Sequence, residues 1–176
     1  AAGHRVDSIG KLHFRADEDD NGFSDSQIAM HVVDSLGDLM GLIREDLPVR
    51  GGSWKMAGMA GPGESMYSTY DRDIAARAQV WLRQEAPRLD KPWVLFVSLV
   101  CPHFPLIAPP EFYEMYPHDM LPHPKGNHPD FELHPWIDKF QKLQCHDDFF
   151  TEETRKVAIA SYYGLCSYLD SNIQHV

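Results

Sequence analysis

One histidine and one Lys-x-His pair have residue types and positions that fit chemistry on an anion. His103 lies between Pro102 and Pro105. It directly follows a nearly continuous apolar run at residues 93–100. Prolines stiffen the backbone on both sides of an imidazole that can hold a charge, transfer a proton or bind a metal. His103 is therefore a candidate functional residue. The alternative is a histidine of a proline-rich loop without a chemical role.

Lys11 and His13 form the second candidate. If residues 11–14 are extended, the two side chains point to the same face, because side chains along a strand alternate with a period of two. A cation beside an imidazole favours an anionic ligand. The alternative is an exposed lysine and an exposed histidine near a strand end.

The elements that must position these residues indicate an α/β fold. The run at residues 93–100 does not alternate polar with apolar, which predicts a parallel strand covered on both faces. Pro102 ends this strand and leaves His103 at its carboxyl end, where ligands bind in open α/β sheets. An amphipathic helix is expected at residues 68–86, and a helix before a buried strand is half of a parallel α/β unit.

The remaining elements are a short strand that leads into a turn at Gly10 within residues 5–14, a strand or helix start at 28–33, and helices at 34–45, at 111–116 and from Thr151 onwards. Two long loops are expected at residues 46–66 and 117–150. The second loop holds five histidines whose spacing matches no metal-binding motif: His118, His123, His128, His134 and His146. We expect this loop to cover the site, and a metal-binding module is the alternative.

Composition narrows the class of protein. The chain has 176 residues, which fits one domain, and its net charge of −10 argues against nucleic-acid binding. No apolar run approaches the roughly 18 residues of a membrane span, so we expect no membrane partner. Cys101, Cys145 and Cys166 are widely spaced and form neither a disulfide framework nor a zinc site.

Three segments resemble the sulfatase family of the alkaline phosphatase superfamily. Gly3-His-Arg-Val-Asp-Ser-Ile-Gly-Lys-Leu-His-Phe14 resembles the sulfatase segment G-Y-x-T-x-x-x-G-K-W-H. Residues 97–105, followed by Pro109-Pro110, resemble the family's apolar strand that ends in P-H-x-P. Residues 162–176 resemble the helix before its second metal-binding strand. The chain looks most like the choline-sulfatase and phosphonate monoester hydrolase branches.

The resemblance implies that residues 1–176 are the central part of a sulfatase catalytic domain. The expected fold is a partial alkaline-phosphatase-like sandwich with a mostly parallel sheet flanked by helices, incomplete at both ends. By resemblance, the catalytic residues are Lys11, His13 and His103. Lys11 and His103 bind the substrate's sulfate, and His13 positions a hydrated formylglycine nucleophile.

The resemblance also implies cofactors that this chain does not supply. None of the three cysteines lies in the family's C-x-P/A-x-R motif, so formylglycine would come from a Cys or Ser outside the chain. The ligands of a divalent cation, expected to be calcium, would also lie outside it, and no metal ligand is assigned here. The chain alone is therefore expected to be inactive.

The expected function is hydrolysis of a small-molecule sulfate ester by the full-length enzyme. One alternative is a phosphonate or phosphate mono- or diester hydrolase of the same superfamily, because the same cationic groups suit either anion. The other is a non-catalytic, His-rich metal-binding module. The sequence leaves open whether the protein is a homo-oligomer, and whether it works in the cytoplasm or the periplasm of a bacterium.

Overall fold

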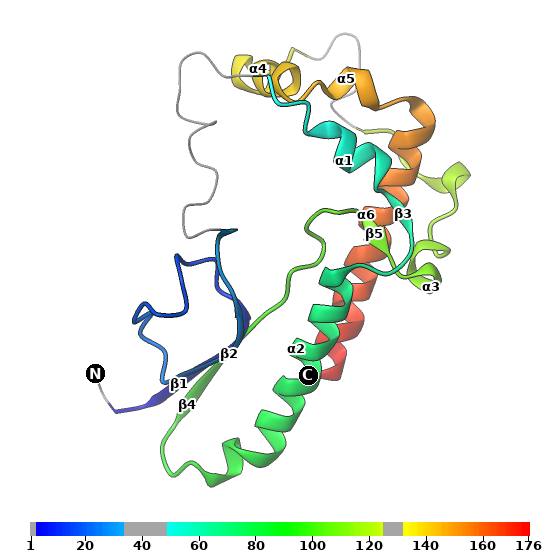
Figure 1. The fold of residues 1–176 in the computed structure, drawn as a ribbon. Coiled ribbons are helices and arrows are strands. Elements are labelled where there is room, and N and C mark those ends of the chain that lie inside the picture. The colour runs from blue at the N-terminus through cyan, green and yellow to red at the C-terminus, as the bar shows by residue number, and fades with distance from the viewer. Residues whose placement is uncertain (1–2, 34–48, 125–131) are drawn as a thin grey trace. The chain divides into compact units, whose positions relative to one another are not determined.

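A computed structural model describes residues 3–33, 49–124 and 132–176 (Figure 1). The helix predicted at residues 34–45 lies outside the described residues. The chain divides into two compact units. The first comprises Ala1–Leu39, Met66–Cys101 and Leu169–Val176, and the second comprises Met40–Ser65 and Pro102–Tyr168.

The first unit is built on a parallel sheet of three strands. The strands are β1 (Arg5–Lys11), β2 (Asp25–Met30) and β4 (Trp93–Ser98), in the order β2-β1-β4 (Figure 1). Both neighbouring pairs are parallel, and the β1–β4 register begins with Arg5 opposite Trp93. The carboxyl ends of β1 and β4 therefore meet at one edge of the sheet.

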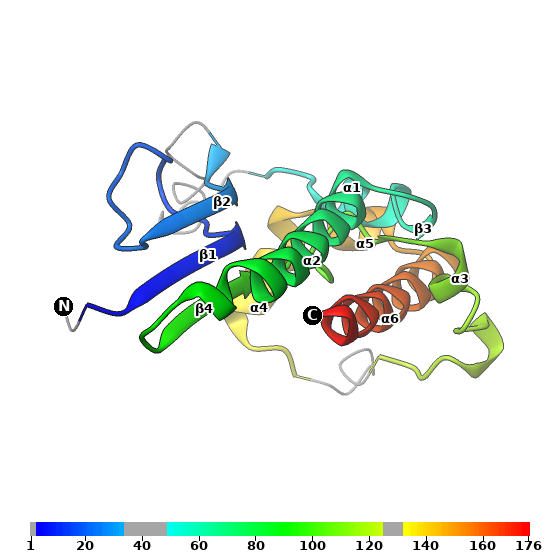
Figure 2. The ribbon, with the colours of Figure 1, turned by 90° about the horizontal axis from the view of Figure 1, so that it is seen from below.

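Helix α2 (Met66–Gln84) packs along β1 and β4 (Figure 2). Ile9 of β1 forms a buried cluster with Ile74, Ala78 and Trp81 of the helix. These helix positions follow the 3.6-residue period, so burial of one stripe stabilises both helix and sheet. The predicted α/β fold and the predicted helix at residues 68–86 are confirmed. The helix gives way to a short 3₁₀ turn (Ala86–Arg88) that contains Pro87.

The prediction that residues 93–100 are covered on both faces is wrong for the described residues. Val94 and Phe96 are 55% and 46% exposed. β4 is an edge strand of the sheet, and α2 covers only one of its faces. An unbroken apolar run shows that a strand can be buried, but it does not supply the layer that covers the second face.

The second unit combines short elements with a long helix. Its two-stranded parallel sheet pairs β3 (Gly61–Pro62) with β5 (Ile107–Ala108). Its helices include α1 (Ser53–Gly58), α3 (Pro110–Tyr113), α4 (Pro135–Leu143), α5 (His146–Phe149) and most of α6 (Glu152–His175), with a 3₁₀ turn η3 at His118–Met120. None of the helices in the described ranges combines the length and the hydropathy needed to cross a membrane.

The predicted long loops at residues 46–66 and 117–150 therefore contain regular structure within their described parts, which corrects the sequence interpretation. Helix α4 begins at Pro135, and the ring nitrogen Nδ1 of His134 accepts a hydrogen bond from the backbone N–H of Trp136 (3.2 Å). Proline at the first position of a helix needs no N–H partner. In this segment proline starts a helix, whereas the sequence analysis treated it as a mark of irregular structure.

Candidate functional site

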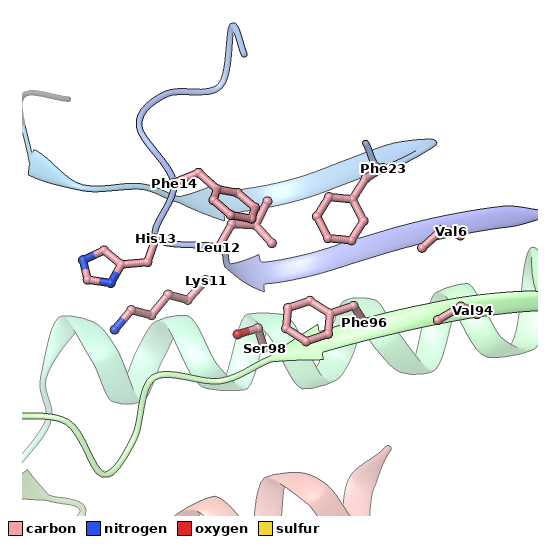
Figure 3. Close-up of a pocket in the computed structure, with 9 residues that line it drawn as sticks. All are labelled: Val6, Lys11, Leu12, His13, Phe14, Phe23, Val94, Phe96 and Ser98. Carbon is pink, nitrogen blue, oxygen red and sulfur yellow. The ribbon is translucent and has the colours of Figure 1, made fainter. Parts of the chain in front are cut away.

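The end of β1 places Lys11 and His13 beside each other by means of a tight turn. The backbone N–H groups of Leu12 and His13 both donate to the carbonyl of Met30, at 3.1 and 2.9 Å. His13 adopts a left-handed conformation with φ 58°, so residues 11–14 are not extended. The prediction that strand alternation points the Lys11 and His13 side chains to one face is therefore wrong in its cause. The side chains of Lys11 and His13 nevertheless extend to the same side, past the carboxyl ends of the strands (Figure 3).

Gly10 fixes the position of Lys11 against the neighbouring strand. Gly10 has φ +104°, and a Cβ atom built on it would lie 2.2 Å from the carbonyl oxygen of Ser98. That space admits only a hydrogen, and few side chains tolerate the backbone angle. A glycine at this position lets β1 and β4 approach closely just where the cationic residues begin.

Lys11 and His13 line one end of a cavity of about 470 Å³ (Figure 3). Ser98, the last residue of β4, also lies at this polar end. The rest of the cavity lies over the open face of the sheet and is apolar: Val6, Leu12, Phe14, Phe23, Val94 and Phe96. The cavity therefore joins a cationic rim to an aromatic and aliphatic floor.

The polar ends of the Lys11 and His13 side chains face no protein partner within the described residues. Neither the ammonium of Lys11 nor the ring of His13 has a hydrogen-bond or ion-pair partner there. The Lys11 side chain is half-buried and that of His13 is exposed. A lysine that approaches the sheet edge without a carboxylate partner can interact with an anionic group from solution.

His103 belongs to the second unit, as the second residue of that unit's segment Pro102–Tyr168. Its imidazole is exposed; Nδ1 lies 2.8 Å from the carbonyl oxygen of Phe104, and the two rings stack at 4.6 Å. The structure brings Lys11 and His13 together, and it does not fix His103 relative to them. Two residues of extended chain span about 7 Å, so the Cα atom of His103 lies within that distance of the Cα atom of Cys101. Cys101 ends the segment Met66–Cys101 of the first unit.

Asp71 is a site-related residue that the sequence analysis missed. It lies on the buried face of α2 with 0% exposure. Its two carboxylate oxygens accept hydrogen bonds from the backbone N–H groups of Val100 (2.7 Å) and Cys101 (2.8 Å). One feature of the sequence could have pointed to this residue: Asp71 lies one turn before Ile74, on the apolar stripe of the predicted helix. A buried carboxylate without a partner would be costly there, so a partner had to be expected.

The histidine-rich segment does not assemble a metal site within the described residues. The ring nitrogen Nε2 of His118 is hydrogen-bonded to the hydroxyl of Tyr113 (2.9 Å). The other ring nitrogen, Nδ1, lies 3.6 Å from a carboxylate oxygen of Glu153. His118 and His123 line a small cavity of about 170 Å³. In the described ranges, no group of three or more His, Cys, Asp or Glu residues could hold a metal ion. His128 lies outside those ranges.

Comparison with known proteins relates the chain to sulfatases. No protein-family model matches it. It is 31% identical over 97 residues to an arylsulfatase of Clostridium perfringens (strain 13 / Type A). The match covers 53% of this chain and 19% of that protein, so the matched part spans about a fifth of the relative's length. This similarity supports a relationship to sulfatases at most, and it does not distinguish the choline-sulfatase and phosphonate monoester hydrolase branches.

Proposed function

We propose that this chain is part of a sulfatase-like hydrolase that cleaves sulfate esters. The observation that carries the proposal is the pair formed by Lys11 and His13 at the carboxyl edge of a parallel sheet. Both side chains lack partners within the described residues and line a cavity there. The similarity to an arylsulfatase supports the same reaction class. Cationic side chains at such an edge suit an anionic substrate.

Each candidate residue has a role that sulfuryl transfer needs. Negative charge on the sulfate oxygens is stabilised by fixed positive charge, which the ammonium of Lys11 supplies. His13 lies beside it and orients the attacking group. The departing alkoxide needs a proton, and in this proposal His103 binds a sulfate oxygen and donates a proton near the leaving group.

The residues that the structure describes do not fit a metal site, and the buried Cys101 does not fit a nucleophile. The described residues form no metal-binding group. Burial is the main cause that raises the pKa of the Cys101 thiol, and nearby Asp71 raises it further, which disfavours a reactive thiolate. In the proposal, the divalent cation and the formylglycine belong to segments outside this chain. We therefore expect no turnover by residues 1–176 alone.

The test is an assay of the full-length protein that contains this chain. Hydrolysis of 4-nitrophenyl sulfate is compared with that of 4-nitrophenyl phosphate and a 4-nitrophenyl phosphonate, for the wild type and for Lys11→Ala, His13→Asn and His103→Gln. Asparagine is chosen at position 13 because it tolerates the left-handed backbone of that residue. Lys55→Ala serves as the control, since this lysine belongs to helix α1 of the second unit, where its ammonium lies over the ring of Trp54.

The expected result is preferential hydrolysis of the sulfate. Each of the three variants should lose about 10²–10³-fold in kcat/KM, the typical cost of removing one group that stabilises the transition state. The control should stay within twofold of the wild type. A preference for the phosphate or the phosphonate would reassign the substrate to the related ester hydrolases. Full activity of Lys11→Ala would refute the site.

A further inference from the structure

We propose that Asp71 is a positioning residue, which holds the end of β4 and thereby sets the direction of the chain that leads to His103. This inference rests on the proposed function, because it takes His103 as a catalytic residue. It begins from the two short hydrogen bonds that the carboxylate accepts from Val100 and Cys101.

Asp71 closes the strand end in a way that a neutral side chain cannot. β4 ends at Ser98, and the N–H groups of Val100 and Cys101 donate to the carboxylate of Asp71 beyond it. One oxygen takes each donor, and hydrogen bonds to an ionised acceptor are about twice as strong as neutral ones. Both residues and the carboxylate are buried, so breaking the bonds would leave a charge and two donors without water.

This restraint is transmitted to His103 through very little chain. Only Pro102 separates Cys101 from His103, and its ring fixes φ near −65°. With the N–H of Cys101 held, few backbone angles remain free before the imidazole. The position of Asp71 therefore determines where this segment leaves the sheet.

The same helix also contacts the end of β1. Ile74, one turn after Asp71, lies against Gly10: its Cδ1 atom is 2.8 Å from the position of an added Cβ. Gly10 precedes Lys11, so α2 holds both strand ends that carry candidate catalytic residues. A single rigid helix would then keep Lys11 and the start of the His103 segment in register.

The decisive variant is Asp71→Asn in the full-length protein, with Asp7→Asn as the matched control. Asp7 is also a buried carboxylate of the first unit, 1% exposed and bonded to Trp81 and Arg5, but it lies mid-strand in β1. Asparagine keeps the shape of both sites. At position 71 it turns one acceptor into a donor that faces a backbone N–H.

Three readouts separate positioning from general destabilisation. Below the unfolding temperature of each variant, Asp71→Asn should lower kcat at least 10-fold and leave KM within about threefold of the wild-type value. It should also alter the basic limb of the pH dependence of kcat. Asp7→Asn should leave kcat and the profile unchanged. The backbone amides of Val100 and Cys101 should exchange with solvent deuterium faster in Asp71→Asn than in the wild type and in Asp7→Asn.

Equal kcat in Asp71→Asn and the wild type would overturn the inference. If that variant does not fold, amide hydrogen exchange of the wild type decides: the amides of Val100 and Cys101 must be as protected as those of the core, and rapid exchange refutes the restraint. If His103→Gln loses activity and Asp71→Asn does not, the positioning role of Asp71 is rejected and the proposed function stands. Full activity of His103→Gln rejects the role of His103 in the proposed function.

Discussion

Replacement of Gly10 by alanine should strongly destabilise the first unit, because two independent costs coincide at this position. Gly10 has φ +104°, which few side chains adopt, and an added Cβ would lie 2.2 Å from the carbonyl oxygen of Ser98. Real Cβ atoms essentially never approach closer than 3.0 Å, so β1 and β4 would have to separate where they are paired.

The magnitude follows from separating the two costs. A positive φ at a residue other than glycine costs about 1–2 kcal/mol, and overpacking against backbone that cannot move aside adds about 1–3 kcal/mol. Gly10→Ala should therefore lower the free energy of unfolding by about 2–5 kcal/mol. Gly22 is the matched control: it has φ +80°, and nothing lies within 4 Å of an added Cβ. Gly22→Ala should show only the first cost.

The measurement is urea unfolding of the purified chain followed by tryptophan fluorescence. The rings of Trp81 and Trp93 lie 4.8 Å apart at a 72° angle in the first unit, so their part of the emission reports on that unit, and Trp54 and Trp136 report on the second. The free energy of unfolding is extrapolated to water for the wild type and both variants. If Gly10→Ala is not at least about 1 kcal/mol less stable than Gly22→Ala, the close approach of β1 and β4 does not carry the assigned cost.

Three further substitutions test other parts of the packing. Trp81→Phe removes the indole N–H that donates to the buried carboxylate of Asp7 at 2.7 Å, and should lower the free energy of unfolding by about 1–3 kcal/mol in the same urea assay; an unchanged value would contradict the bond. Burial is the main cause that raises the pKa of Tyr70 to about 12. The stability that Tyr70 contributes should be intact below pH 10 and be lost between pH 10 and about 12, so the unfolding free energy of Tyr70→Phe should fall less over this range. In the second unit, Gly164→Val should lower the thermal midpoint, because even a Cβ atom would lie only 3.0 Å from that of Ala108; an unchanged midpoint would show that this contact can relax.

Local patterns were sufficient for the elements that bury one clear stripe. The helix containing Ile74, Ala78 and Trp81 was predicted because its apolar residues recur with the helical period, and those residues form the core. The start of α6 was predicted from Thr151, whose hydroxyl accepts a hydrogen bond from the N–H of Thr154 at 3.2 Å. These features depend on residues within one or two turns of one another.

Features that depend on distant residues were not predictable from the sequence. The left-handed turn at His13 is held by the carbonyl of Met30, and no local pattern in residues 11–14 shows that bond. The pairing of Asp71 with Val100 and Cys101 likewise joins a helix to a strand end about 30 residues away. The shared side of Lys11 and His13 was expected from strand alternation, yet the turn produces it.

The strand order β2-β1-β4 has a consequence for folding during synthesis on the ribosome. β1 is the middle strand, and its first register pair with β4 joins Arg5 to Trp93. The ribosome makes β1 before β4, and the paired residues Arg5 and Trp93 are 88 residues apart, so β1 cannot pair with β4 until that length of chain has been synthesised. Parallel strands that are distant in sequence pair slowly. Newly made chains should therefore depend on chaperones while the edge of β1 that will pair with β4 is still exposed.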